Sequence, residues 1–258
     1  MSSSFRGSIS ISTTVYSEKY ILIAWKSRHQ LTPYERRGFA HFMYLTISAH
    51  MEGVIAESIK KRCSSMIYVF SGTQFPPITF TGHDNQTHIQ DSYPMHDAIS
   101  NIVKNLEKES STAPYQKLKE LYKLVFSLKL KELIGDDLEQ DLDALSSLRN
   151  LLAHGRDLSF NYEHDSADLF SSPQEISLNS NPLEKFAKRL YHANIIDNLM
   201  ITTENHDDLR SSIYSDSAIL HFYNAVREAE SKLLDNLFVS ERYIKAVRGL
   251  PELEEQSS

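Results

Sequence analysis

The sequence predicts a mainly all-α protein, and two observations carry that prediction. Apolar residues recur at intervals of three and four along most of the 258-residue chain, which is the spacing of one helix face. The chain also contains only 8 Gly and 8 Pro, too few for the many turns of an all-β protein. With 41% hydrophobic and 24% charged residues, it has the composition of a folded globular protein.

Net charge and cysteine content narrow the classes of function. The formal charge is -7, so any contact with nucleic acid has to be local rather than a general attraction. Cys63 is the single cysteine, which excludes an intramolecular disulfide and a Cys-rich zinc site. One thiol, no signal-peptide pattern and no apolar run of membrane length predict a cytoplasmic protein that does not contact a membrane.

The first helix is predicted after an N-terminal arm, residues 1–31, in which residues 8–15 alternate as in a short strand or an ordered arm. Thr32, Pro33 and Glu35 form a capping box with proline at the first helical position. A helix is expected from Pro33 to about Arg62, and Gly53 offers a point at which it can break.

Further helices alternate with polar insertions. They are predicted at about 95–108, 115–134, 137–154, 182–198 and 216–237. The insertion at about 64–94 is expected to be irregular, and that at about 156–181 to form a small β-hairpin from Ser159–Tyr162 and Glu175–Leu178. One helical domain over residues 32–240 and a C-terminal tail over 241–258 follow from this pattern.

The helix that ends near Gly155 has two contrasting faces. Rotation at about 100° per residue gathers an apolar face: Leu138, Leu145, Leu148, Leu151 and Leu152. It gathers a face of short polar side chains on the opposite side: Asp143, Ser146, Ser147, Asn150 and His154. Because short side chains let another backbone approach closely, we expect the polar face to be a contact surface rather than ordinary solvated exterior.

Arg149 and His154 lie five positions apart, about 140° around the helix, so they do not form a tight pair within one helix. Two copies related by a two-fold axis would bring two arginines and two histidines together. Histidine can exchange a proton with a hydroxyl near neutral pH, and arginine can stabilise a pentacovalent phosphate. Asn150 can orient a phosphate oxygen. Such a group needs no metal if the nucleophile is the 2′-hydroxyl of RNA.

The run Arg149-Asn150-Leu151-Leu152-Ala153-His154 resembles the R-x4-6-H motif of the HEPN superfamily, in which a polar residue follows the arginine. Residues 49–57 also resemble the first core helix of some members. The resemblance implies an antiparallel helical bundle, a homodimer formed through the Arg149–His154 helix, and a metal-independent endoribonuclease with no cofactor. It implies Arg149, His154 and Asn150 as the catalytic residues. It further implies a toxin–antitoxin, phage-defence or stress setting with an antitoxin or defence protein as partner.

Other interpretations of these residues stay open. Arginine and histidine are favoured in the last turn of any helix, because they complement the dipole there. Arg36 and His41 also match the bare spacing, but Arg37 follows Arg36 and the pair opens its helix, so we treat it as a decoy. A non-catalytic helical binding or scaffold module is the second hypothesis for the chain.

Three further groups of residues are weaker candidates. Glu52 can orient Arg149 or His154 from the first long helix, although such residues usually face solvent. The lysines of the 115–134 helix, Lys117 and Lys123 among them, form a solvated face or a basic strip for RNA, to which Arg156 can add a phosphate contact. The His-rich and Asp-rich loop at 82–97 is interpreted as solvated rather than as a metal site.

Overall fold

The computed structural model describes residues 14–72, 78–81, 87–90, 93–154, 174–175, 182–197, 200–201, 211–235, 250 and 252–253. Its helical elements are α1 (Thr14–Ser27), the short 3-10 helix η1 (Arg28–Gln30), α2 (Pro33–Gly72), α3 (Tyr93–Ser110), α4 (Tyr115–Phe126), α5 (Leu130–Ile134), α6 (Asp136–Ala153), α7 (Pro182–His192) and α9 (Asp216–Asp235). These confirm the all-α class, to which two short strand pairs are added.

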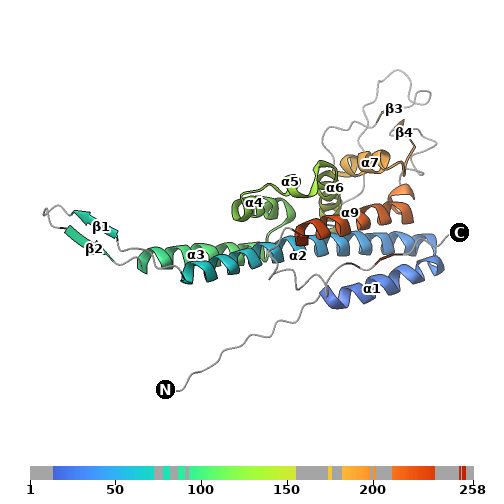
Figure 1. Cartoon of the computed structure of the whole chain (residues 1–258). Helices are drawn as coiled ribbons and strands as arrows, with labels where there is room; N and C mark the ends of the chain where they lie inside the picture. Colours follow the sequence, from blue (N-terminus) through green and yellow to red (C-terminus); the bar gives the residue numbers. More distant parts are fainter. Residues whose placement is uncertain are drawn as a thin grey trace.

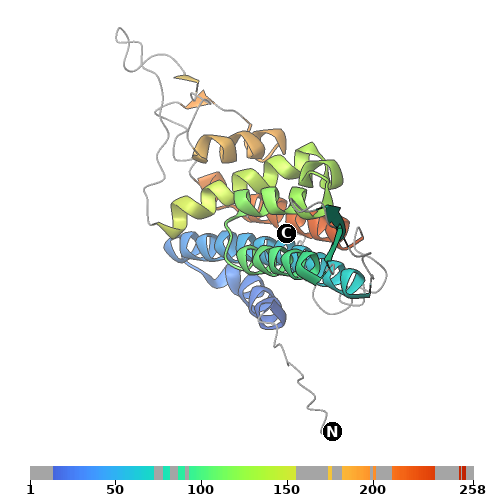
Figure 2. The same cartoon turned by 90° about the vertical axis from the view of Figure 1, so that its left-hand side faces the viewer.

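Helix α2 is the element on which the others are arranged. Its 40 residues correspond to about 60 Å of helix, and Figure 1 shows α1 on one side of it and α4, α6 and α7 on the other. The view in Figure 2 shows the same layers, with α7 outside α6 and α3 beside α2. Glu52, halfway along α2, contacts Arg149 of α6.

The core is built from the inner faces of α2, α7 and α9. Phe186 and Phe222 stack with ring centroids 4.4 Å apart, and Tyr44 meets Phe186 edge-on at 5.3 Å. The Tyr44 hydroxyl donates to the Ile213 carbonyl at 2.6 Å, which satisfies the buried polar end of the ring. Apolar side chains of α4 and α6, such as Leu118 and Leu148, extend this core.

The predicted start of α2 is confirmed, but its predicted end is wrong. The Thr32 backbone N–H donates to the Glu35 carboxylate at 2.8 Å, and Glu35 N–H donates back to the Thr32 hydroxyl at 3.4 Å. The helix continues through Gly53 and past Arg62 to Gly72. One helical glycine costs about 1 kcal/mol, and packing against several helices along α2 outweighs that cost.

The described residues between 64 and 94 are not irregular as predicted. After the end of α2, β1 (Ile78–Thr81) pairs antiparallel with β2 (Thr87–Gln90). The alternation of β-branched and aromatic residues in β1 suits a strand, but four residues are too short to stand out among the glycines and prolines nearby. The 115–134 helix is also interrupted, because Ser127 adopts a left-handed φ of 56° between α4 and α5.

The second polar insertion contains a strand with a different partner. Strand β3 (Gln174–Glu175) pairs with β4 (Met200–Ile201), and residues 159–162 of the expected hairpin lie outside the described residues. Helix α7, which lies between β3 and β4 in the chain, ends at His192 instead of at the predicted Asn198, because Asn194 has a left-handed φ of 54°.

Both predicted terminal segments contribute to the core. Helix α1 lies within the predicted N-terminal arm and buries Ile21 and Trp25 against α2. Leu250 and Leu253, in the predicted C-terminal tail, are buried as well. None of the described helices combines the length and the apolar character that crossing a bilayer requires.

Candidate functional site

The C-terminal end of α6 carries Arg149, Asn150 and His154 together. The Arg149 side chain is 31% exposed, while Asn150 and His154 are exposed. One guanidinium nitrogen, Nη1, donates to the Asn150 Oδ1 at 3.0 Å. His154 caps the helix, with its backbone N–H 3.3 Å from the Asn150 carbonyl. The expected glycine cap, Gly155, lies outside the described residues.

Glu52 from α2 reaches the same arginine. Its Oε2 lies 3.4 Å from Arg149 Nη2, and only 15% of the Glu52 side chain is exposed. Burial raises the pKa of Glu52, and the charge of Arg149 and the Tyr115 backbone N–H only partly offset this. Tyr115 is the first residue of α4, where backbone N–H groups have no helical partner and favour a negative charge. Glu52 thus lies at the junction of α2, α4 and α6.

His154 is at the same end of α6 but not in contact with Arg149. Within the described residues, its imidazole makes no hydrogen bond or ion pair, and Glu52 contacts Arg149 rather than His154. None of the described residues therefore occupies the exposed imidazole. A site that uses both residues on one phosphate needs either a substrate that bends around the helix end or a second copy of α6.

The small polar face of α6 is largely occupied by the chain itself, so much of it is a contact surface rather than solvated exterior, as expected. Ser146 is buried, and Asp143 accepts hydrogen bonds from Gln116 at 2.9 Å and from Lys119 at 3.0 Å. Gln116 and Lys119 reach Asp143 from α4 through their side chains, and Lys119 also pairs with Glu139 of α6 at 2.8 Å. Only Asn150 and His154, at the end of that face, remain exposed.

Most of the predicted basic strip is neutralised. Lys117 lies 3.3 Å from Glu120, Lys119 lies 2.8 Å from Glu139, and Lys131 lies 3.4 Å from Asp136. Lys123 is exposed and has no ion pair among the described residues. Arg156, the other candidate for a phosphate contact, lies outside the described part of the chain. Helices α4 and α5 therefore offer scattered positive charge rather than a continuous strip.

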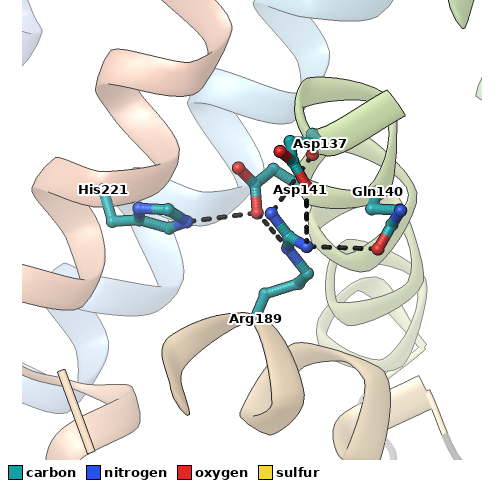
Figure 3. A network of polar contacts seen from close by, with 5 residues as sticks. All are labelled: Asp137, Gln140, Asp141, Arg189 and His221. Atoms are coloured by element: carbon teal, nitrogen blue, oxygen red, sulfur yellow. Dashed lines mark hydrogen bonds and ion pairs between the residues drawn. The ribbon is translucent and has the colours of Figure 1, made fainter. Parts of the chain in front are cut away.

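A second polar cluster, which the sequence did not indicate, lies about two to three turns before Arg149 on α6 (Figure 3). Asp141 Oδ1 accepts from Arg189 Nε at 2.6 Å and from His221 Nε2 at 3.1 Å. Arg189 also donates to the Gln140 side chain at 3.1 Å and to the Asp137 carbonyl at 3.3 Å. Burial raises the pKa of Asp141, but its two partners outweigh this and hold the pKa below its ordinary value.

This cluster ties α7 and α9 to α6. Arg189 uses its side-chain donors within the protein, and Asp141 is buried. Its partners are 48 and 80 positions away in the chain, so no local motif reveals them. We interpret it as a structural support that fixes α6, and with it the end that carries Arg149.

Neither a metal site nor a reactive thiol is found in the described part of the chain. The described residues contain no group of three or more His, Cys, Asp or Glu side chains arranged to hold a metal. Residues 82–86 and 91–92 of the His-rich and Asp-rich loop lie outside that part. Cys63 is buried, and burial together with the nearby Glu107 raises the pKa of its thiol to about 11.

No protein-family model matches the chain, and neither the curated proteins nor the solved structures contain a match.

Proposed function

We propose that the chain is a metal-independent endoribonuclease of HEPN type. One observation carries the proposal: Arg149 is held by Asn150 and Glu52, yet about a third of its side chain stays exposed, beside the exposed His154. A held, partly exposed guanidinium is suited to binding a phosphate, because its orientation is fixed before the ligand arrives.

In the proposed reaction, His154 takes the proton of an RNA 2′-hydroxyl, and the oxygen attacks the adjacent phosphorus. The new bond from phosphorus to the 2′-oxygen forms as the bond to the 5′-oxygen breaks, giving a 2′,3′-cyclic phosphate. Arg149 stabilises the extra negative charge on the phosphoryl oxygens, and Asn150 keeps Arg149 in place. A second protonated histidine returns a proton to the 5′-oxygen.

The second histidine is His154 of another copy in this proposal. The exposed end of α6 then forms the centre of a two-fold interface, which presents two Arg149 and two His154 side chains to one RNA backbone. Lys117, Lys123 and Arg156 are candidates for further phosphate contacts. The proposed setting is a cytoplasmic toxin–antitoxin, phage-defence or stress system, with an antitoxin or defence protein as partner.

A non-catalytic binding or scaffold module is the competing function. The ion pair between Arg149 and Glu52 favours it, because that pair also serves simply to hold α6 on α2. In such a module His154 has no chemical role.

Cleavage of total cellular RNA in the presence of EDTA separates the two functions. We expect the wild type to cut, and Arg149→Ala and His154→Ala each to lose at least roughly a hundredfold in rate while keeping a native circular dichroism spectrum. Exposed Lys188→Gln on α7 serves as the control and should cut like the wild type. A wild type that leaves RNA intact, or a His154→Ala chain that cuts normally, supports the scaffold instead.

A further inference from the structure

A strip of exposed and half-buried residues runs along the first turns of α2, far from Arg149. Tyr34, Arg37, Gly38 and His41 are spaced by three, one and three positions, which places them on one face of the helix. Tyr214, just before α9, lies beside this face, and we call the five residues the α2 strip. It contains the histidine of the decoy motif, which the proposed function leaves unused.

The α2 strip contains an exposed aromatic ring, Tyr34, and a cation, Arg37, that lies near a second ring, Tyr214. Tyr34 is 85% exposed, so its ring stabilises little in the folded chain. The Arg37 guanidinium lies 6.0 Å from the centroid of the Tyr214 ring, and the Tyr214 hydroxyl lies 3.5 Å from His41 Nε2. Burial lowers the pKa of His41, so the fixed positive charge of the strip belongs to Arg37.

Gly38 keeps the centre of the strip open. A Cβ atom built at Gly38 meets no other atom within 4 Å, so no neighbouring backbone or side chain requires glycine there. Glycine inside a helix costs about 1 kcal/mol relative to alanine. The missing side chain leaves flat, accessible backbone between Tyr34, Arg37 and His41, where a planar group can lie.

The two acidic residues near the α2 strip, Glu35 and Asp216, already have hydrogen-bond partners within the protein. Glu35 binds the Thr32 backbone N–H at 2.8 Å, and Asp216 binds Arg28 at 2.7 Å. Arg36, on the other side of α2, is exposed and makes no ion pair with any described residue. Arg37 is therefore the one fixed charge among the five residues of the α2 strip, in a protein with a net charge of -7.

We propose that the α2 strip binds single-stranded RNA, with a base stacked on Tyr34 and a phosphate on Arg37. Stacking on exposed aromatic rings combined with arginine is how proteins bind single strands, whose bases are free of partners. An acidic peptide would satisfy Arg37 but leave Tyr34 and the open backbone at Gly38 without a partner. The inference rests on the proposed function for its substrate class, RNA, and adds that this RNA is single-stranded rather than duplex.

The strip is suited to bind RNA outside the cleavage point. Arg37 precedes Glu52 by about 22 Å along α2, and their directions differ by about 60° around the helix axis. A strand held at Arg149 therefore has to extend by several nucleotides to reach Tyr34. Short oligonucleotides should not detect the strip, whereas longer ones should.

Fluorescence anisotropy of a labelled oligouridine of about twelve nucleotides, with the full chain carrying His154→Ala, tests the strip without cleavage. Gly38→Gln should weaken binding roughly tenfold, because the new side chain covers the open backbone. Gly53→Gln is the matched control, since Gly53 is also exposed in α2 with nothing within 4 Å of an added Cβ. Both variants should melt at a higher temperature, and only Gly38→Gln should bind less.

Side-chain variants test the two contacts separately. Tyr34→Ala should weaken binding roughly tenfold and Tyr34→Phe should not, because stacking needs the ring and not the hydroxyl. Arg37→Gln should lower the salt dependence of binding by about one phosphate contact. Lys188→Gln with Tyr191→Ala removes an exposed cation and ring from α7 and should leave binding unchanged.

The proposal that the α2 strip binds RNA is overturned if Gly38→Gln and Gly53→Gln bind the labelled RNA equally well. It is also overturned if polyglutamate competes for binding as well as oligouridine does. Absence of any RNA binding also overturns it. The strip and the proposed function fail separately. If the chain binds RNA through Tyr34 but cleaves none, the ribonuclease proposal is wrong and the strip proposal stands. If Gly38→Gln cleaves RNA with an unchanged KM, the strip proposal is wrong and the ribonuclease proposal stands.

Discussion

Glu52 and Arg149 lie 97 positions apart in the chain, yet their side chains meet at 3.4 Å where α2 passes under the end of α6. The two side chains differ in burial: 15% of the Glu52 side chain is exposed, compared with 31% of the Arg149 side chain. Glu52 is thus the fixed partner and Arg149 the one that can reach a ligand. This asymmetry separates a supporting carboxylate from a binding guanidinium.

Glu52→Gln should change how stability depends on pH. The folded state raises the pKa of Glu52 above its ordinary value of 4.5, so the folded protein holds this proton more tightly than the unfolded chain does. Acidification through the raised pKa toward 4.5 should therefore stabilise the wild type relative to Glu52→Gln, and raising the pH should remove that gain. Urea unfolding at several pH values measures the difference. Glu120→Gln, at an exposed position on α4, should show no such trend.

Glu52→Gln should also slow the proposed cleavage, through kcat rather than KM. The amide still contacts Arg149 but no longer holds its charge in place, so the loss falls on the transition state, where phosphate charge increases. We expect kcat to fall roughly tenfold with KM within about twofold. An equal rise in KM would instead show that Glu52 supports ground-state binding.

Local rules in the sequence predicted the start of α2 and the polar end of α6. The Thr32–Glu35 capping box and the Arg149–Asn150–His154 run each depend on residues within one or two turns. The partners of those residues could not be predicted, because Asp141, Arg189 and His221 come from three helices that only the tertiary fold brings together. Ser146 shows the same limit, since a small polar side chain suits both an exposed interface and a buried helix contact.

The predicted helix boundaries were wrong where a single backbone angle decides where a helix ends. Ser127 and Asn194 both take left-handed φ values, which serine and asparagine tolerate but do not signal as strongly as glycine. The lysine pattern of residues 115–134 continues across Ser127 without interruption, so periodicity alone predicts one helix. Glu139, which pairs with Lys119, belongs to α6 and is equally invisible to a local pattern, whereas Glu120 lies in α4 itself, three positions after Lys117.

Asp141→Asn should be among the most destabilising polar substitutions of α6. It leaves Arg189, which is only 12% exposed, without its closest anionic partner, and we expect a loss of about 2–4 kcal/mol at neutral pH. The folded state lowers the pKa of Asp141, so its contribution is present above 3.8 and is lost as the pH falls through the lower folded value. The difference from wild type in urea unfolding should therefore shrink in acid. Asp137→Asn, at a 92% exposed carboxylate 3.7 Å from Arg189, should cost less than about 0.5 kcal/mol.

Ser127→Gly should stabilise the chain. The Ser127 φ of 56° is one that glycine adopts without strain, so the substitution should raise the free energy of unfolding by about 0.5–1 kcal/mol. Ser127→Ala is the matched control, because it removes the hydroxyl but keeps the Cβ atom that disfavours this angle, and it should give no gain. Chemical denaturation measures both. A destabilised Ser127→Gly, together with a destabilised Ser127→Ala, would mean that the serine hydroxyl itself holds the junction of α4 and α5.

Mixing two inactive chains should restore the proposed activity if the site is shared between copies. Arg149→Ala and His154→Ala chains, co-refolded in equal amounts, give about half mixed dimers in a random exchange. Each mixed dimer retains one Arg149 and one His154, on different copies, at the same interface. The single His154 of a mixed dimer can act as the base while water protonates the 5′-oxygen, so we expect cleavage far below the wild-type rate but above that of either variant refolded alone. A site completed within one chain would give no recovery, because each copy lacks one of the two residues. The oligomeric state of both variants, measured by light scattering, has to match the wild type, since a monomeric variant would fail to complement for a different reason.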